Sequence, residues 1–213
     1  MDVSHITSPY FAEAVAYAQE IAEGRVLANR ARKLACQRFL NDLQRDDLDF
    51  KDGQFDLAIK LIEGTIHHVR GEDRAGVSYK GRPMILAPWQ KFVIVNLFGF
   101  FKKGTNIRRY TEALIFLPRK QGKTSFSAAL GEVKSIIDRA SGAVTYIVAN
   151  SVKQTMESFQ FLKDNIEDLR PDVKKLRIRD NNQEHSISVD FGDGTAEIYA
   201  IANQEDKLDS LNC

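Results

Sequence analysis

The sequence predicts an α/β protein in which a parallel sheet is flanked by helices and preceded by an α-helical N-terminal appendage. Two observations support this fold class. Residues 10–44 are rich in Ala, Glu, Leu and Arg and contain no proline, which is typical of helices. Further along, two apolar, strand-like runs, 113–117 and 144–149, are each followed by a helical pattern, 123–139 and 151–169. Alternating strands and helices indicate parallel strands joined by crossover helices.

The N-terminal part is expected to consist mainly of helices. Apolar residues recur at helical spacing up to residue 44, which predicts two helices or one interrupted near Gly24: Phe11, Val15, Ala18, Ala22, Leu34 and Leu40. The acidic stretch 45–52 is expected to be a solvated connector. A further helix places Phe55, Ile59, Ile62 and Ile66 on one face, with Gly71 just past its end. With 213 residues, we expect a helical appendage over 1–80 and the α/β domain over 81–213.

Turn residues divide the second part of the chain. Gly142 is expected to end the helix that begins near Lys123, and Pro171 the helix that begins near Ser151. Two short strand patterns follow, 186–191 and 196–202, on either side of Gly192-Asp193-Gly194. This turn chemistry predicts a β-hairpin.

Bulk composition excludes some classes of protein. The formal net charge is +1, with 30 basic and 29 acidic residues, so a DNA contact would need a local patch. A basic stripe, Arg25, Arg30, Arg32 and Lys33, is one such patch, although a solvated helix face explains it better.

No apolar run approaches the roughly 20 residues that span a bilayer, and the N-terminus does not resemble a signal peptide. The distant pair Cys36 and Cys213 predicts neither a disulfide nor a metal site. We therefore expect a cytoplasmic protein without a membrane partner.

The most informative segment lies between the strand-like run 113–117 and the helix that begins at Lys123. Gly122-Lys123-Thr124 fits the end of a phosphate-binding loop, but Leu117 stands where the usual first glycine would be. In such a loop the glycine lets the backbone approach the phosphates, and the lysine reaches the β- and γ-phosphate oxygens. The threonine hydroxyl binds Mg²⁺. A bare Gly-Lys-Thr could also be an exposed helix start, but the strand–loop–helix context favours a site for ATP and Mg²⁺.

Two more cations, Arg119 and Lys120, lie within the loop. Either they are solvated loop charges, or Arg119 stabilises the charge that develops on the γ-phosphate during transfer. The second interpretation makes Arg119, with Lys123, a candidate catalytic residue.

Three segments together resemble the large terminase subunit of tailed bacteriophages and prophages, in its N-terminal ATPase part. The loop Pro118-Arg119-Lys120-Gln121-Gly122-Lys123-Thr124 is similar to the divergent phosphate loop, or Walker A motif, of that family. The segment 86–92 resembles its Pro-Trp-Gln element, and 146–159 its second strand and the following helix. The resemblance covers roughly residues 84–212. It implies a P-loop NTPase of the ASCE/RecA-like type.

The resemblance also implies which residues bind nucleotide: Trp89, Gln90, Pro118, Arg119, Lys120, Gln121, Gly122, Lys123, Thr124 and Ser125, with Thr124 on the metal ion. In the family the glutamine region contacts adenine, and a Gln side chain offers both a donor and an acceptor. For Trp89 an apolar anchor in the core is an equally good explanation. For Asn150 and Ser151, helix capping is favoured over a DNA contact.

Proteins of this family pump double-stranded DNA into procapsids and cut it with a separate nuclease domain. The implied partners are double-stranded DNA, the portal protein, the small terminase subunit and further copies in a ring, in the cytoplasm of an infected or lysogenic bacterium. The family's second acidic motif, the Walker B strand, is not found: 196–201 is apolar but continues into Ala202 and Asn203, and 205–212 resembles the segment that precedes the acidic strand. We therefore expect a chain truncated before that strand, without the nuclease domain, that binds ATP weakly, does not hydrolyse it efficiently, and is marginally stable.

Two other functions remain open. A superfamily 2 helicase-like, nucleic-acid-dependent ATPase would share the Pro-Trp-Gln element, but its loop usually keeps the first glycine that Leu117 replaces. A non-catalytic interaction fragment would bind no nucleotide.

Overall fold

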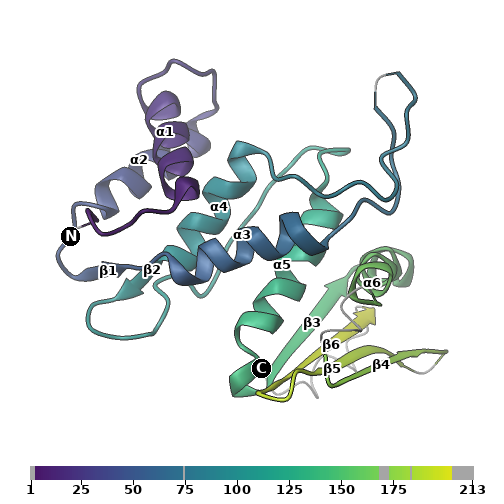
Figure 1. The fold of residues 1–213 in the computed structure, drawn as a ribbon. Helices are drawn as coiled ribbons and strands as arrows, with labels where there is room; N and C mark the ends of the chain where they lie inside the picture. The colour runs from purple at the N-terminus through teal and green to yellow at the C-terminus, as the bar shows by residue number, and fades with distance from the viewer. Residues whose placement is uncertain (1–2, 74, 168–172, 183, 203–213) are drawn as a thin grey trace. The chain divides into compact units, whose positions relative to one another are not determined.

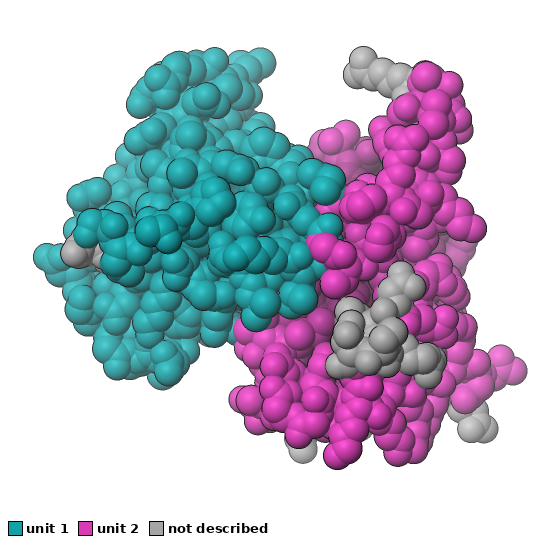
Figure 2. Space-filling view, viewed as in Figure 1, with its two compact units in different colours: residues 1–63, 85–116 teal, residues 64–84, 117–213 magenta. Residues whose placement is uncertain are grey.

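The computed structural model describes residues 3–73, 75–167, 173–182 and 184–202. The chain forms two compact units that interleave along the sequence, 1–63 with 85–116 and 64–84 with 117–213 (Figure 2). The expected domain division at residue 80 stays a prediction. Three of the sequence-based expectations concern residues outside the described ranges, namely Pro171, the stretch 203–212 and Cys213.

The first unit is built mainly of helices: α1 (Pro9–Ala22), α2 (Arg30–Asp42), α3 (Gly53–Thr65), which runs two residues past the unit boundary, and α4 (Pro88–Gly99) (Figure 1). Of the two alternatives for residues 10–44, the structure has two separate helices, α1 and α2. The helix predicted next is also confirmed, with Phe55, Ile59 and Ile62 buried, but it ends at Thr65, well before Gly71. Apolar periodicity found α1, α2 and α3 because each buries one face. The helix α4 was not predicted.

The stretch 45–52 is not only a solvated connector, so that expectation is wrong. It contains β1 (Leu48–Phe50), which pairs antiparallel with β2 (Phe100–Lys102). Leu48 and Phe50 are buried, and the Phe50 and Phe100 rings meet edge to face with centroids 4.8 Å apart. A Cβ on Gly99 would lie 2.5 Å from the Phe50 ring, so this close approach requires glycine. Burial of two apolar side chains outweighs the charge of the neighbouring residues.

The second unit is a four-stranded sheet with two long helices on the same side of it (Figure 1). Its elements are α5 (Lys123–Ile137), the short 3₁₀ helix η1 (Arg139–Ser141), β3 (Ala143–Ala149), α6 (Val152–Ile166), β4 (Lys175–Asp180), β5 (His185–Asp190) and β6 (Thr195–Ala202). The predicted helices, the strand 144–149 and the hairpin of 186–191 with 196–202 are confirmed, with small shifts at their ends.

The expectation of a parallel sheet is only partly correct. The strand order is β3-β6-β5-β4, and of these three pairings only β3 with β6 is parallel. The tight turn at Gly192 forces β5 and β6 to be antiparallel, and β4, which the sequence did not predict, adds antiparallel to β5. The sheet is therefore mixed.

The predicted strand at 113–117 is wrong for the described structure, because this segment has no regular structure. Leu114 and Phe116 are 94% and 92% exposed. Apolar residues make a strand only where the backbone finds a neighbouring strand to pair with, and none of the described strands pairs with this segment.

Candidate nucleotide-binding site

The N-terminus of α5 presents backbone donors that have no acceptor within the helix. Gly122 precedes the helix in a left-handed conformation, with φ at 70°, and its carbonyl accepts the first helical hydrogen bond from the Phe126 N–H at 2.9 Å. The N–H groups of Lys123, Thr124 and Ser125 consequently have no acceptor within the helix. Together with the helix dipole, these three N–H groups form a site suited to an anion such as phosphate.

The body of α5 holds that N-terminus in place. Phe126, Ala129 and Val133 are almost completely buried. Lower down, the Ser135 hydroxyl lies 2.8 Å from the Gly131 carbonyl and 2.6 Å from the Thr145 hydroxyl on β3. The helix is thus fixed to the sheet while its first turn faces solvent.

The loop before α5 is exposed and locally strained. Five candidate side chains are exposed: Pro118, Arg119, Lys120, Gln121 and Lys123. Lys120 has φ at 65° and is the one non-glycine residue with positive φ in the part of the chain that the structure describes. A long side chain in this conformation costs on the order of 1 kcal/mol, and such strain is common at binding sites. A Cβ on Gly122 would meet no atom within 4 Å, so its φ rather than crowding selects glycine.

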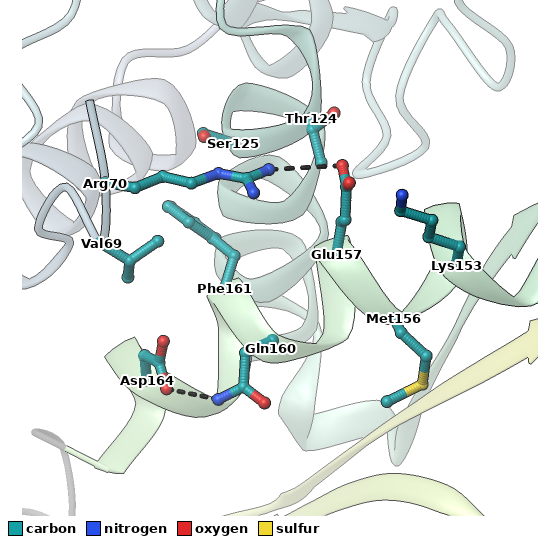
Figure 3. Close-up of a pocket in the computed structure, with 10 residues that line it drawn as sticks. All are labelled: Val69, Arg70, Thr124, Ser125, Lys153, Met156, Glu157, Gln160, Phe161 and Asp164. Carbon is teal, nitrogen blue, oxygen red and sulfur yellow. Dashed lines mark hydrogen bonds and ion pairs between the residues drawn. The ribbon is translucent and has the colours of Figure 1, made fainter. Parts of the chain in front are cut away.

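A cavity of about 470 Å³ opens beside the first turn of α5 (Figure 3). Thr124 and Ser125 line the cavity from α5, and Val69 and Arg70 line it from the segment between α3 and α4. The remaining lining residues come from α6: Lys153, Met156, Glu157, Gln160, Phe161 and Asp164. An Arg70 Nη atom lies 3.3 Å from a Glu157 carboxylate oxygen, and the Gln160 amide donates to Asp164 at 2.6 Å. Nothing in the sequence pattern singled out Arg70 or Glu157, because no motif links them.

Trp89 and Gln90 belong to the first unit, whereas residues 118–125 belong to the second. Both residues lie in the first turn of α4. Gln90 is 8% exposed, and its side-chain oxygen accepts the Ala87 N–H at 2.8 Å. Trp89 is half-buried. The capping bond gives Gln90 a local structural role that the sequence did not predict.

Ser151 is the N-cap of α6, as expected: its hydroxyl accepts the Gln154 N–H at 3.3 Å. Asn150 directly precedes it and is exposed. The capping bond accounts for Ser151 without any contact to DNA.

Glu132 is a buried carboxyl group that the sequence did not reveal. It lies on α5 and is 1% exposed, and one of its carboxyl oxygens has no hydrogen-bond partner among the described residues. Loss of hydration raises the pKa of Glu132 to about 8. Its side chain is therefore mostly protonated at neutral pH.

Metal binding would depend on few protein ligands. Within the described ranges, no cluster of three or more His, Cys, Asp or Glu side chains is arranged to hold a metal ion. Mg²⁺ commonly binds through one or two protein oxygens together with the phosphates of its nucleotide. The Thr124 hydroxyl beside the α5 N-terminus fits that mode of binding.

No helix in the described residues has the length and apolar character needed to cross a membrane.

Comparison with known proteins identifies the family. A family model described as terminase large subunit, ATPase domain, matches residues 88–212, which is more than half of the chain. No curated protein matches the sequence, and no solved structure matches it. The match begins at the first residue of α4 and includes the loop 118–122 and all of α5, β3 and α6. The chain therefore belongs to the family of terminase large subunits, through their ATPase domain.

Proposed function

We propose that this chain is the ATP-binding part of a viral DNA-packaging motor, in which ATP hydrolysis is coupled to the movement of double-stranded DNA into procapsids. Family membership supports an ATPase of the packaging machinery. The observation that carries the proposal is the first turn of α5, where three N–H groups without helical acceptors follow a left-handed glycine and an exposed loop with several cations.

Each residue of the loop has a proposed role in this function. The N–H groups of α5 and the Lys123 ammonium bind the β- and γ-phosphates, and Thr124 binds Mg²⁺. Arg119 stabilises the charge on the transferred phosphoryl group. Pro118, Lys120, Gln121, Gly122 and Ser125 shape the loop around the phosphates. Trp89 and Gln90 contact the adenine.

The wider setting of the motor is part of the proposal. Its partners are double-stranded DNA, the portal protein, the small terminase subunit and other copies of the large subunit in a ring. It works in the cytoplasm of an infected or lysogenic bacterial cell.

Titration with a fluorescent ATP analogue in the presence of Mg²⁺ tests the nucleotide site. Wild-type chain should bind the analogue, and Lys123→Ala should abolish binding. Lys134→Ala is the matched control, because Lys134 lies near the other end of the same helix and pairs with Asp138 at 2.7 Å. No binding by the wild type, or equal loss in both variants, would reject this site and favour a non-catalytic interaction module.

A further inference from the structure

We propose that Arg70 is a ligand of the terminal phosphate of ATP, and that Glu157 is the anion that holds Arg70 in place until ATP arrives. When Mg²⁺ and ATP occupy the loop, Arg70 leaves the Glu157 carboxylate and binds the γ-phosphate. This inference rests on the proposed nucleotide site and adds to it a phosphate-sensing residue that lies about 50 positions before the loop.

The cavity brings these groups together. Arg70, Glu157 and Thr124 all line the same 470 Å³ space. Figure 3 shows the Arg70 guanidinium and the Glu157 carboxylate meeting next to Thr124, the residue proposed to bind Mg²⁺. Lys153 projects into the cavity from the preceding turn of α6. A phosphate bound at the start of α5 would therefore have an arginine and a lysine close by.

The backbone that carries Arg70 is firmly attached to α6. The His67 N–H donates to the Asn165 side chain at 2.7 Å, and Asn165 itself is buried and donates to the Phe161 carbonyl at 2.9 Å. The His68 N–H donates to the Arg82 carbonyl at 2.9 Å. After Arg70, the Gly71 carbonyl accepts the Tyr79 N–H at 2.8 Å. Because its backbone is held before and after it, Arg70 can change partner by rotating its side chain alone.

The ion pair is weak enough to be exchanged. The Arg70 side chain is 71% exposed and the Glu157 side chain 38%. Exposed pairs of this kind contribute about 0–1 kcal/mol. A terminal phosphate carries more negative charge than a carboxylate and also accepts both arms of a guanidinium, so it should displace Glu157. Asp164, the other acidic group of the cavity, already accepts from Gln160.

An exchange of partners predicts opposite effects for the two residues. Arg70→Ala should weaken ATP binding about tenfold, because a charge-assisted hydrogen bond is lost, and change ADP binding less than about twofold. Glu157→Gln should strengthen ATP binding about threefold, since Arg70 is then free before the nucleotide arrives. In the double variant the gain from Glu157→Gln should vanish. A purely structural ion pair would instead make both single variants weaker or leave both unchanged.

The experiment is a double-mutant cycle measured by titration of the whole chain with ATP and with ADP, each with Mg²⁺. Arg179→Ala is the matched control, because Arg179 forms an exposed pair with Glu184 at 2.9 Å in the same unit, outside the cavity. Tighter ATP binding by Glu157→Gln that depends on Arg70 supports the inference, and it cannot arise from a misfolded protein.

Two results would overturn the inference, and they are distinguishable. If the wild type binds ATP through Lys123 but Arg70→Ala binds ATP and ADP as the wild type does, the exchange is rejected while the nucleotide site stands. If the wild type shows no binding that depends on Lys123, both the nucleotide site and the exchange are rejected.

Discussion

Helices α4 and α5 both begin within segments that resemble the terminase family, but their first turns are built differently. At the start of α4, Pro88 occupies the first helical position, where no N–H is needed, and Gln90 accepts the Ala87 N–H. At the start of α5, Gly122 has no side chain that could cap the helix, and the following three N–H groups have no acceptor within the helix. The first helix end uses its own residues to satisfy its backbone, whereas the second leaves its donors open to a ligand.

This difference separates a helix start that is capped by its own residues from one that has no side-chain cap. A side-chain cap stabilises a helix by about 1 kcal/mol, and a helix end without such a cap lacks this contribution. The buried residues of α5, Phe126 and Ala129 among them, provide the stability that the missing cap does not. Such an arrangement is expected where the open donors are needed for an anion.

The largest expected effect concerns Arg119 at the open helix start. In a terminase large subunit that carries this ATPase domain, Arg119→Ala should lower ATP turnover by on the order of 10³-fold, because arginines in this role stabilise the transition state. The affinity for ATP should change far less. Steady-state hydrolysis and nucleotide titration measure the two quantities separately. An unchanged turnover would remove Arg119 from the catalytic residues and leave it as a solvated loop cation.

The next effect concerns the buried part of the same helix. Since the pKa of Glu132 is raised to about 8 from 4.5, the unfolded chain loses its proton at lower pH than the native chain does. The contribution of Glu132 to stability is therefore complete below about pH 4.5 and is lost as the pH rises towards 8. Glu132→Gln should raise the free energy of unfolding by about 2–4 kcal/mol at pH 8 and by little at pH 4.5.

Urea unfolding of both proteins at the two pH values measures this difference. Equal stabilisation at both would show that Glu132 is not charged differently in the native and unfolded chains.

Two glycines of α5 allow a smaller, internally controlled test. Gly122→Ala places a Cβ at φ 70° and should cost about 1 kcal/mol of stability, as well as weakening nucleotide binding. Gly131→Ala lies in the middle of the helix, where the new Cβ would meet the Thr145 methyl at an ordinary 3.7 Å, and should stabilise the chain by about 0.5–1 kcal/mol. Thermal unfolding gives both values. Equal effects in the two variants would mean that the conformation of Gly122 is not what selects glycine there.

The smallest expected effect tests whether the closed start of α4 also binds adenine. Gln90→Glu keeps an oxygen that can accept the Ala87 N–H but removes the amide donor that adenine recognition would use. Because Gln90 is 8% exposed, the new carboxylate should cost on the order of 1 kcal/mol of stability at neutral pH, while the preference for ATP over GTP should fall. Gln90→Ala loses the capping bond and should cost about 1 kcal/mol. A preference for ATP that survives in Gln90→Glu would assign Gln90 to capping alone.

Errors in the sequence-based fold have a common physical origin. The helices α1, α2, α3, α5 and α6 and the β5–β6 hairpin were found because their signals are local, in the periodicity of apolar residues and the turn at Gly192. The run 113–117 is equally apolar, but strand formation depends on a pairing partner that no local pattern reveals. The same reason explains why β1 and β4 were missed: each exists because another strand lies beside it.

The sequence by itself determined the family and the helix that follows Gly122-Lys123-Thr124, because these depend on residue types at short, fixed spacing. Tertiary structure alone decided the strand order, the burial of Glu132 and the meeting of Arg70, Glu157 and Thr124 in one cavity. Those three residues come from separate parts of the chain, and only packing of the segment 64–84 and α5 against α6 brings them together. Contacts between residues so far apart in sequence leave no periodic signal, so they become visible only once the chain is folded.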